Sequence, residues 1–371
     1  MIYWLKRNIQ GDKYIWLIAI TLSVIGLLAV YSATSLLAFQ QKGGNTEFFL
    51  LKHFLLIAFS FVAMWFAHKI DYKYYSKISL IGLYVSLPLL FLTYKFGVNI
   101  NEASRWISIP IINMAFQPSD LAKLSLIIYL SSFLAKKQYD LENIKTLIMP
   151  FVWIGLICMF IALTNLSTAL ILGATSILLM FISRVRISHL SLLILFILIS
   201  GGIALLTGQR GYTAISRVED FINKKNLPYQ LEQAYIAVST GGLFGKGPGN
   251  SNQKNFLPQS SSDFIYAIIV EEYGFIMGIS VLLLYLILLY RGLKIFINSD
   301  RPFGGLLSAG LSFALVIQAI TNMCVVVGLL PVTGVTLPLV SMGGTSQLFT
   351  GITIGIILSI SRENNKEISY A

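Results

Sequence analysis

The stretch that decides the fold is the first long apolar run, Tyr14–Ala38, which reads YIWLIAITLSVIGLLAVYSATSLLA and contains no charged residue. About 20 apolar residues in an α-helix cross the hydrocarbon core of a bilayer, so this run is long enough for one span. Lys6 and Arg7 precede it, but it exceeds the apolar region of a cleaved signal peptide. The sequence therefore predicts a retained first transmembrane helix.

Similar apolar runs recur along the chain, which is 56% hydrophobic and 12% charged with a mean hydropathy of +0.76. Such a composition lies outside the range of soluble domains. The runs are Tyr14–Ala38, Phe49–Ala67, Ile78–Tyr94, Pro118–Ala135, Leu147–Leu163, Leu166–Ile182, Leu190–Thr207, Asp263–Tyr290, Gly304–Leu329 and Pro338–Ile360. They predict an all-α, polytopic membrane protein of about ten helices, and a single domain over residues 1–371.

Basic residues gather in every second connection, including the N-terminal Lys6 and Arg7 and the C-terminal Arg362 and Lys366. By the positive-inside rule these connections and both termini are cytoplasmic. The net charge of +11 therefore points to anionic lipid rather than to nucleic acid. This topology depends on a break at Leu163–Leu166, because a continuous helix there would reverse every later segment.

Two longer connections lie on the opposite, extracytoplasmic face, Lys95–Gln117 and Gly208–Ser262. The second joins the predicted helices seven and eight and is the longest polar stretch of the chain. Within it, apolar residues of Tyr229–Thr240 recur on one helical face, which predicts a short interfacial helix. Gly241 and Gly242 follow and are expected to end it.

The run Gly241–Asn250 combines glycines with one lysine, Lys246. This composition is typical of a backbone nest for an anion and equally of a flexible loop. It lacks the GK[ST] ending of a nucleotide-binding P-loop. The two cysteines, Cys158 and Cys324, lie inside apolar runs, and no His/Cys cluster has metal-ligand spacing.

Three carboxylates stand at or within the eighth predicted helix. Asp263 opens it, where an Asp serves either as an N-cap or in chemistry. Glu271 would lie about 12 Å further along an ideal helix, so the two carboxylates are not a close pair. For Glu271 and Glu272 we predict structural pairing, because an unpaired carboxylate is costly inside a membrane. Lone cations near helix ends, such as Arg105 and Lys123, commonly extend to lipid headgroups.

Over nearly its whole length the chain resembles the shape, elongation, division and sporulation (SEDS) family, which includes FtsW, RodA and SpoVE. The resemblance rests on several motifs in matching order: Ala103–Ile107, Phe116–Lys123, Gly241–Gln253, Leu257–Pro258 with Asp263–Ile265, Glu271–Glu272, Gly328–Gly334 and Ser341–Gly344. The end of the first helix, Val30–Ala33, is more similar to the division branch, FtsW, than to RodA.

This resemblance implies a peptidoglycan glycosyltransferase that polymerises lipid II at the outer face of the bacterial cytoplasmic membrane, for septal synthesis. It also implies a class B penicillin-binding protein as partner, with other division-complex membrane proteins. The residue matching Asp263 is the family's catalytic carboxylate. The expected substrate-binding residues are Arg105, Lys123, Lys246, Asn250, Gln253 and Lys254.

Three positions depart from the family pattern. Leu163–Thr168 replaces Gln-Pro-Asp-Leu-Gly-Thr, Gln259 replaces a glutamate, and Asp120 replaces a glutamate. The first two changes remove carboxylates, which argues against a second outer-face acid or a carboxylate-bound metal. We therefore expect no required cofactor, although a divalent cation could assist.

A single base suffices for this transfer because the leaving group, a lipid pyrophosphate, is already a stable anion, whereas a glycosidase must protonate a sugar alkoxide. Two other functions would use the same helical bundle. A lipid II flippase would depend on Glu271 and Glu272 at mid-membrane. A non-catalytic scaffold for division proteins would not need Asp263 at all.

Overall fold

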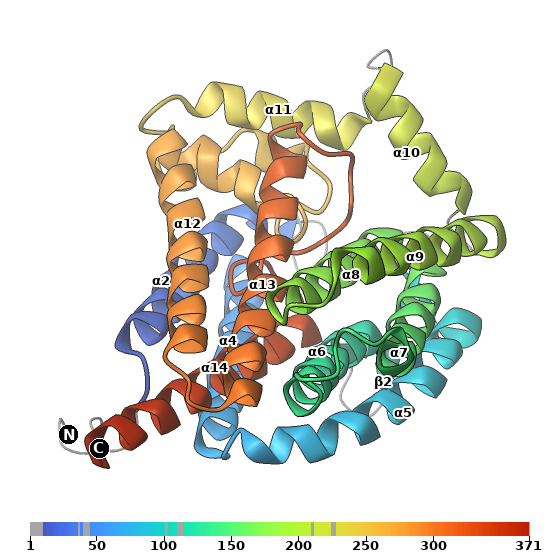
Figure 1. Ribbon diagram of the computed structural model, residues 1–371. Coiled ribbons are helices and arrows are strands. Elements are labelled where there is room, and N and C mark those ends of the chain that lie inside the picture. Colours follow the sequence, from blue (N-terminus) through green and yellow to red (C-terminus); the bar gives the residue numbers. More distant parts are fainter. Residues whose placement is uncertain are drawn as a thin grey trace.

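The structure, a computed structural model, describes residues 10–35, 38–39, 45–100, 103–109, 114–208, 211–223 and 228–370. A helix occupies each of the ten predicted apolar runs (Figure 1). These helices are α2 (Lys13–Ala33), α4 (Thr46–Lys69), α5 (Lys73–Phe96), α6 (Pro118–Lys136), α7 (Ile144–Ala162), α8 (Leu166–Ile182), α9 (Ile187–Thr207), α12 (Ile265–Ile297), α13 (Pro302–Val326) and α14 (Thr345–Tyr370). Seven of them in the described ranges are long and apolar enough to cross a bilayer, namely α2, α4, α5, α7, α9, α12 and α13.

The critical break between α7 and α8 is present. Helix α7 ends at Ala162, and Asn165 caps α8 by accepting a hydrogen bond from the Thr168 amide at 3.3 Å. A short side-chain acceptor at this position satisfies an amide that has no partner within the helix. The prediction of two separate helices is therefore confirmed.

Helices α14 and α4 cross at close range. A Cβ on Gly351 would lie 2.3 Å from the Ser60 carbonyl oxygen, and one on Gly355 would lie 2.4 Å from that of Met64. Small residues four apart let two helix backbones approach closely, which replaces the hydrophobic driving force that lipid does not supply. Helix α13 packs against α12, α6, α8 and α14 and so occupies the centre.

The connection Lys95–Gln117 contains a small antiparallel sheet, which the all-α prediction missed. Its strands are β1 (Val98–Ile100), β2 (Ala103–Ile109) and β3 (Met114–Phe116), in the order β1-β2-β3. Strands this short carry almost no alternating pattern in the sequence. The correction matters because β2 carries Arg105 towards the bundle.

The long polar connection Gly208–Ser262 contains two helices where one was predicted. Helix α11 (Tyr229–Gly241) matches the predicted interfacial segment, and Gly242, with φ of +59°, follows its end. Helix α10 (Gly211–Asn223) was not predicted, and a single helical turn, η1 (Gln253–Asn255), comes later. In Figure 1, α10 and α11 lie at the end of the bundle opposite to the start of α2 and the end of α14.

Two helices begin later than predicted. Helix α12 starts at Ile265, so Asp263 lies in the preceding turns, and its N-cap residue, Phe264, makes no side-chain capping bond. Asp263 is therefore not the N-cap, and ideal helix geometry does not relate it to Glu271. Helix α14 starts at Thr345 because Gly344, at φ of +57°, interrupts the apolar run.

Helix α12 is broken at Gly274, and the loop 242–247 fills the break. The carbonyls of Glu271–Glu272 accept hydrogen bonds from loop amides at 2.9 Å, and the Phe275 amide donates to the Gly242 carbonyl at 2.9 Å. Gly274 has φ of +80°, and a Cβ there would lie 2.2 Å from a loop carbonyl oxygen. Only glycine fits this close approach.

Candidate active site

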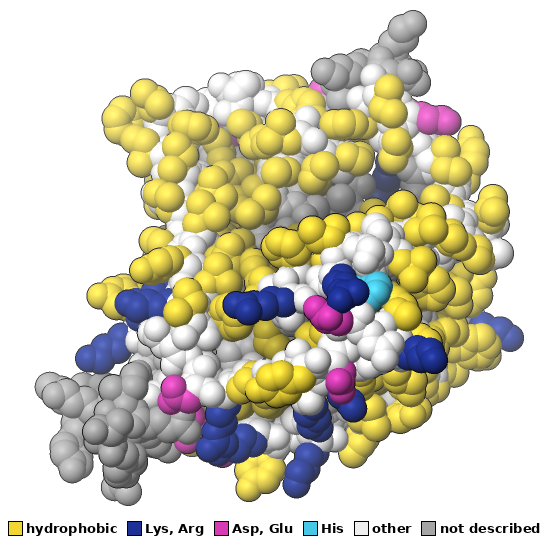
Figure 2. Space-filling model, in the orientation of Figure 1, with side chains coloured by type: hydrophobic (Ala, Val, Ile, Leu, Met, Phe, Trp, Pro, Cys, Tyr) yellow, Lys and Arg dark blue, Asp and Glu magenta, His cyan; other side chains and the backbone are white. Residues whose placement is uncertain are grey.

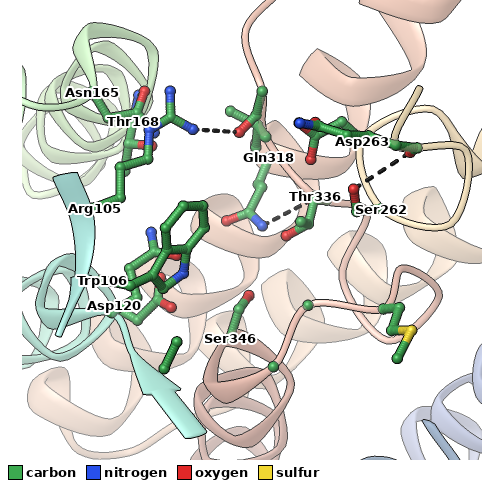
Figure 3. A pocket seen from close by; sticks show the side chains of 18 of the residues that line it. Arg105, Trp106, Asp120, Asn165, Thr168, Ser262, Asp263, Gln318, Thr336 and Ser346 are labelled. Carbon is green, nitrogen blue, oxygen red and sulfur yellow. Dashed lines mark hydrogen bonds between the residues drawn. The ribbon is translucent and has the colours of Figure 1, made fainter. Parts of the chain in front are cut away.

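A cavity of about 910 Å³ opens among β2, α6, α8, α10, α13 and the turns before α12 (Figure 3). Figure 3 shows Trp106 and Asp120 on the opposite side of Gln318 and Thr336 from Asp263. The charged residues on its wall are Lys52, Arg105, Asp120, Lys123, Arg217 and Asp263. The cavity therefore collects cations and carboxylates from distant parts of the chain.

Asp263 is held in place through its own backbone and that of the two residues before it. Its carbonyl accepts a hydrogen bond of 2.7 Å from Asn322 Nδ2. The Ser262 carbonyl accepts from the Ser341 hydroxyl at 2.6 Å, and the Ser261 carbonyl accepts from the Met342 amide at 2.9 Å. These bonds leave the carboxylate of Asp263 directed at the cavity, whose wall it forms.

Two arginines approach Asp263 from different elements. Arg105 of β2 donates from Nη1 to the Gly334 carbonyl at 3.1 Å, and Arg217 of α10 donates to the Val332 carbonyl at 3.2 Å. A Cβ on Gly334 would lie 3.1 Å from Arg105 Nη1 and 3.4 Å from Asp263 Oδ2. The absence of a side chain at Gly334 thus allows the guanidinium and the carboxylate to share one corner of the cavity.

The electrostatics of Asp263 reflect two opposing effects. Burial raises the pKa of its carboxyl group, and the positive charges of Arg105 and Arg217 oppose that rise. Desolvation disfavours a carboxylate, while nearby cations favour it. A raised pKa makes the carboxylate a stronger base than a solvent-exposed aspartate.

The floor of the cavity contains a second acid, Asp120, which pairs with Lys123 one turn along α6 at 2.8 Å. Lys123 Nζ also lies 3.4 Å from Gln318 Oε1, and Gln318 donates to the Thr336 carbonyl at 3.0 Å. Asp120 is buried, and its Oδ2 atom has no hydrogen-bond partner in the described part of the chain. The Asp120 carboxylate is therefore held by Lys123 through one oxygen, while the other oxygen is buried without a partner among the residues that the structure describes.

The structure brings Arg105, Lys123 and Asp263 together but places Lys246, Asn250, Gln253 and Lys254 off the cavity wall. Lys246 Nζ lies 2.6 Å from Glu271 Oε1, and Lys254 Nζ donates to the Gly249 carbonyl at 2.7 Å. The Asn250 side chain donates to the Lys246 carbonyl at 3.1 Å. Their partners are backbone groups of the glycine-rich loop and Glu271 on α12.

Glu271 and Glu272 bind this loop from α12, in an arrangement that we call the carboxylate clamp. Glu271 accepts hydrogen bonds from the Ser251 hydroxyl and from the amides of Asn252 and Gln253, the latter two at 3.1 and 3.3 Å. Glu272 accepts from the Ser251 amide at 3.3 Å and from the Ser32 hydroxyl of α2. The anion that this loop binds is therefore a carboxylate of the protein.

A second cavity of about 340 Å³ adjoins the first and is mainly apolar. It lies among α8, α9, α10 and α13, and its wall includes Leu166, Leu170, Leu205 and Ile317. Arg105, Arg217, Asn165, Ile171 and Val332 line both cavities. An apolar chain in the second cavity would therefore end at the two arginines of the first.

The geometry agrees with comparisons to known proteins. Residues 12–366 match the family model FTSW_RODA_SPOVE, described as cell cycle protein. The chain belongs to the FtsW/RodA/SpoVE family. Among curated members it is 34% identical to stage V sporulation protein E of Bacillus subtilis, over 96% of this chain and 98% of the relative. It is 32% identical to a probable peptidoglycan glycosyltransferase FtsW of Geobacter sp. strain M18, with the same coverage.

Solved structures share the fold of this family member. One chain, from a structure entitled "Structural coordination of polymerization and crosslinking by a peptidoglycan synthase complex", matches with a TM-score of 0.75 and 22% identity, over 95% of this chain and 98% of that chain. Rod shape determining protein RodA of Thermus thermophilus matches with a TM-score of 0.68 and 22% identity, over 95% and 97%. The predicted SEDS resemblance is confirmed.

Sequence reasoning missed several polar residues of the cavity, among them Lys52, Arg217 and Gln318. Gln318 carried a usable signal, because a polar side chain inside the apolar run Gly304–Leu329 is unusual and commonly functional. Arg217 carried a signal too, because the apolar residues of α10 recur on one helical face. Its approach to Asp263, however, depends on how α10 packs.

The departures from the family pattern fall around the same cavity. Asn165 and Thr168 line its wall where the pattern has an aspartate-containing motif, and Gln259 lines it where the pattern has a glutamate. Gln259 has φ of +58°, a strained conformation for a residue with a Cβ. Among the described residues, no three His, Cys, Asp or Glu side chains come together in a metal-binding group.

Proposed function

We propose that this family member is a peptidoglycan glycosyltransferase that polymerises lipid II. The observation that carries the proposal is the placement of the Asp263 carboxylate beside Arg105 and Arg217 on one cavity wall. The names of relatives such as the Geobacter FtsW support the same reaction. A base and a group of cations are what a transfer with a pyrophosphate leaving group requires.

In the proposed mechanism, Asp263 accepts the proton of the acceptor sugar hydroxyl as that oxygen attacks the anomeric carbon of the donor. The new glycosidic bond forms while the bond from that carbon to the phosphate oxygen breaks, with inversion. The electron pair leaves on undecaprenyl pyrophosphate, whose charge Arg105, Arg217 and Lys123 offset. No acid is needed at the leaving group, which agrees with the missing carboxylates at Asn165 and Gln259.

The adjoining apolar cavity supports a lipid-linked donor in particular. Its wall of aliphatic side chains suits part of a polyprenyl chain, and the shared arginines suit the pyrophosphate at the end of that chain. A soluble sugar nucleotide would leave this apolar surface without a partner. The two cavities together therefore favour a lipid-linked substrate.

We further propose ten membrane spans, cytoplasmic termini and an extracytoplasmic active face in the bacterial cytoplasmic membrane. Basic residues lie at the ends of α4, α5, α6 and α7 that face the same side, for example Lys69, Lys73, Lys136 and Lys145. Figure 2 shows most Lys and Arg side chains of the visible face on the lower half. Helices α10 and α11 lie at the other end (Figure 1), which is the face expected outside.

A class B penicillin-binding protein is the proposed partner, because a similar fold occurs in a complex whose title names polymerization and crosslinking. Septal synthesis, with other division-complex proteins, is the proposed setting. Its test is rescue of a strain depleted of its division polymerase, compared with rescue of a strain depleted of its elongation polymerase. Rescue of only the elongation strain would reject the division assignment.

A lipid II flippase is the main alternative, and the carboxylate clamp bears on it. Glu271 and Glu272 are buried and bonded to the loop, and neither lines the cavity. A transport pathway through these glutamates would therefore have to break their hydrogen bonds to the loop. The third function, a non-catalytic scaffold, predicts full cellular rescue by a chain without Asp263.

The deciding experiment incubates the purified chain, bound to its partner, with lipid II, with and without a divalent cation, and resolves the glycan products by gel. We expect polymer from the wild type and none from Asp263→Ala. Asp140→Asn is the matched control, because Asp140 is an exposed carboxylate far from the cavity. Wild-type transport of labelled lipid II across vesicles without polymer would favour the flippase.

A further inference from the structure

One buried amide side chain, Asn322 on α13, joins two segments of the site that are distant in sequence. Its Nδ2 atom lies 2.7 Å from the carbonyl oxygen of Asp263 and 2.7 Å from that of Val335. A carboxamide nitrogen has two hydrogens, so both donors are used. Asn322 therefore fastens the turn before α12 to the segment between α13 and α14.

The energetics suggest that Asn322 is not there for stability alone. The residue is 2% exposed, and its Oδ1 atom has no hydrogen-bond partner among the described residues. Burying an unsatisfied carbonyl oxygen is unfavourable, whereas a leucine of similar size would fill the same space. What the Asn322 amide contributes, and apolar packing would not, is its pair of hydrogen bonds to two backbone segments.

The segment that Asn322 fastens is the one that holds the arginines. The Gly334 carbonyl accepts from Arg105, and the Val332 carbonyl accepts from Arg217. Val335 directly follows Gly334 and is tied by Asn322 to the backbone of Asp263. A single side chain thus links the residue that carries the carboxylate to the backbone that holds both guanidinium groups.

We infer that Asn322 is a positioning residue that fixes the distance between Asp263 and the pair Arg105 and Arg217. This inference rests on the proposed function for its catalytic consequence. In the reaction, the base must meet the acceptor hydroxyl while the cations meet the pyrophosphate of the donor, so a displacement of about 1 Å lowers turnover. Binding of the lipid chain in the adjoining cavity would be little affected.

The test measures lipid II polymerisation by the partner-bound protein carrying Asn322→Leu or Asn322→Asp. Leucine removes both donors at similar volume, and aspartate replaces the donors with an oxygen. We expect kcat to fall about 10- to 100-fold with KM changed less than about 3-fold. Asn322→Gln keeps both donors but moves them by one methylene, and covers the case in which the first two variants do not fold.

Asn364→Leu is the matched control, because Asn364 is also buried and also donates to one backbone carbonyl, that of Ile295. It should leave kcat unchanged. A wild-type kcat in Asn322→Leu, or equal losses in the two leucine variants, would overturn the inference.

Hydrogen exchange separates this inference from the proposed function. In Asn322→Leu, amide exchange should rise in the peptides covering 258–264 and 332–336 and stay unchanged in α8. Unchanged exchange in both peptides would reject the positioning role whatever the enzyme does. Raised exchange in a protein whose wild type makes no polymer would support the link between the segments and reject the proposed function instead.

Discussion

Two regions of this protein bring a carboxylate and a basic side chain together, and they differ in what surrounds the pair. In the carboxylate clamp, Glu271 receives Lys246, the Ser251 hydroxyl and two backbone amides, so its oxygens are fully occupied. In the cavity, Arg105 and Arg217 bond to backbone carbonyls, while Asp263 borders open volume. The first arrangement holds the chain, and the second leaves charge available to a ligand.

The comparison shows why a glycine-rich loop with a lysine is an ambiguous signal. Such a composition predicts a site for an anion, and the loop 242–254 does bind one. The anion is Glu271, which lies on the next helix of the same chain. The composition of a loop predicts that it binds an anion, but only the fold shows whether that anion is a side chain of the same protein or a separate ligand.

The largest expected effect follows from removing the proposed base, Asp263. Asp263→Asn keeps the size of the side chain but cannot accept the proton, so kcat should fall about 100- to 10,000-fold. The measurement is initial-rate polymerisation of lipid II by the partner-bound protein. A loss smaller than tenfold would show that the cavity, like the clamp, uses its carboxylate mainly for structure.

Removing a cavity cation comes next. Arg105→Gln should lower kcat about 100-fold, because a charge developing on the leaving group would lose its partner. Lys246→Gln, on the clamp side, should lower it less than tenfold. Equal losses in the two variants would remove the distinction between the regions.

The pH dependence offers a finer test of the cavity. A carboxylate in the role proposed for Asp263 accepts a proton only when deprotonated, so kcat/KM should rise with pH through the pKa of its carboxyl group. The positive charge of Arg217 lowers that pKa. Arg217→Gln should therefore shift the acidic limb of the profile to higher pH, and a shift to lower pH would contradict the pairing.

On the clamp side the expected change is in stability. Glu271→Gln leaves Lys246 without its charge partner and places an amide against backbone donors, which should destabilise the fold by about 3 kcal/mol. Thermal melting in detergent measures this, with Glu142→Gln as an exposed control. Unchanged melting would mean that the clamp does not hold the loop.

The smallest effect is expected for Lys254→Gln. Within the described part of the chain, its Nζ atom bonds to the Gly249 carbonyl at the surface of the loop. Both activity and melting should stay within measurement error, since such exposed contacts contribute less than about 0.5 kcal/mol. A loss of substrate affinity would return Lys254 to the group of substrate-binding residues.

Much of the fold could be predicted because membrane spans leave long apolar runs. The break at Leu163–Leu166 could be predicted because Thr164, Asn165 and Ser167 interrupt the apolar sequence. In the structure, Asn165 is the helix N-cap there. The start of α12 could not be predicted, since nothing in the sequence shows that Asp263 and Phe264 lie in the turns before the helix rather than in its first turn. The sheet around Arg105 was missed because its strands are too short to show a period.

Site residues could be predicted where a sequence motif contains them, but not where folding brings distant segments together. Asp263 follows a recognisable sequence pattern, and the structure places it on the cavity wall. The neighbourhood of Arg217 and Asp263 arises only when α10 places Arg217 against the Val332 carbonyl. Lys246 shows the reverse case, in which a conspicuous residue has an internal partner.

The break at Gly274 has a practical consequence for labelling. The backbones of the loop and of α12 lie so close that a Cβ would not fit at Gly241, Gly245 or Gly274. A residue inserted between 242 and 247 would therefore shift the hydrogen bonds across the break. An epitope or fluorophore is better placed in the turn between α6 and α7, where Tyr139 is 90% exposed. A tag there leaves the hydrogen bonds between the loop 242–247 and α12 intact.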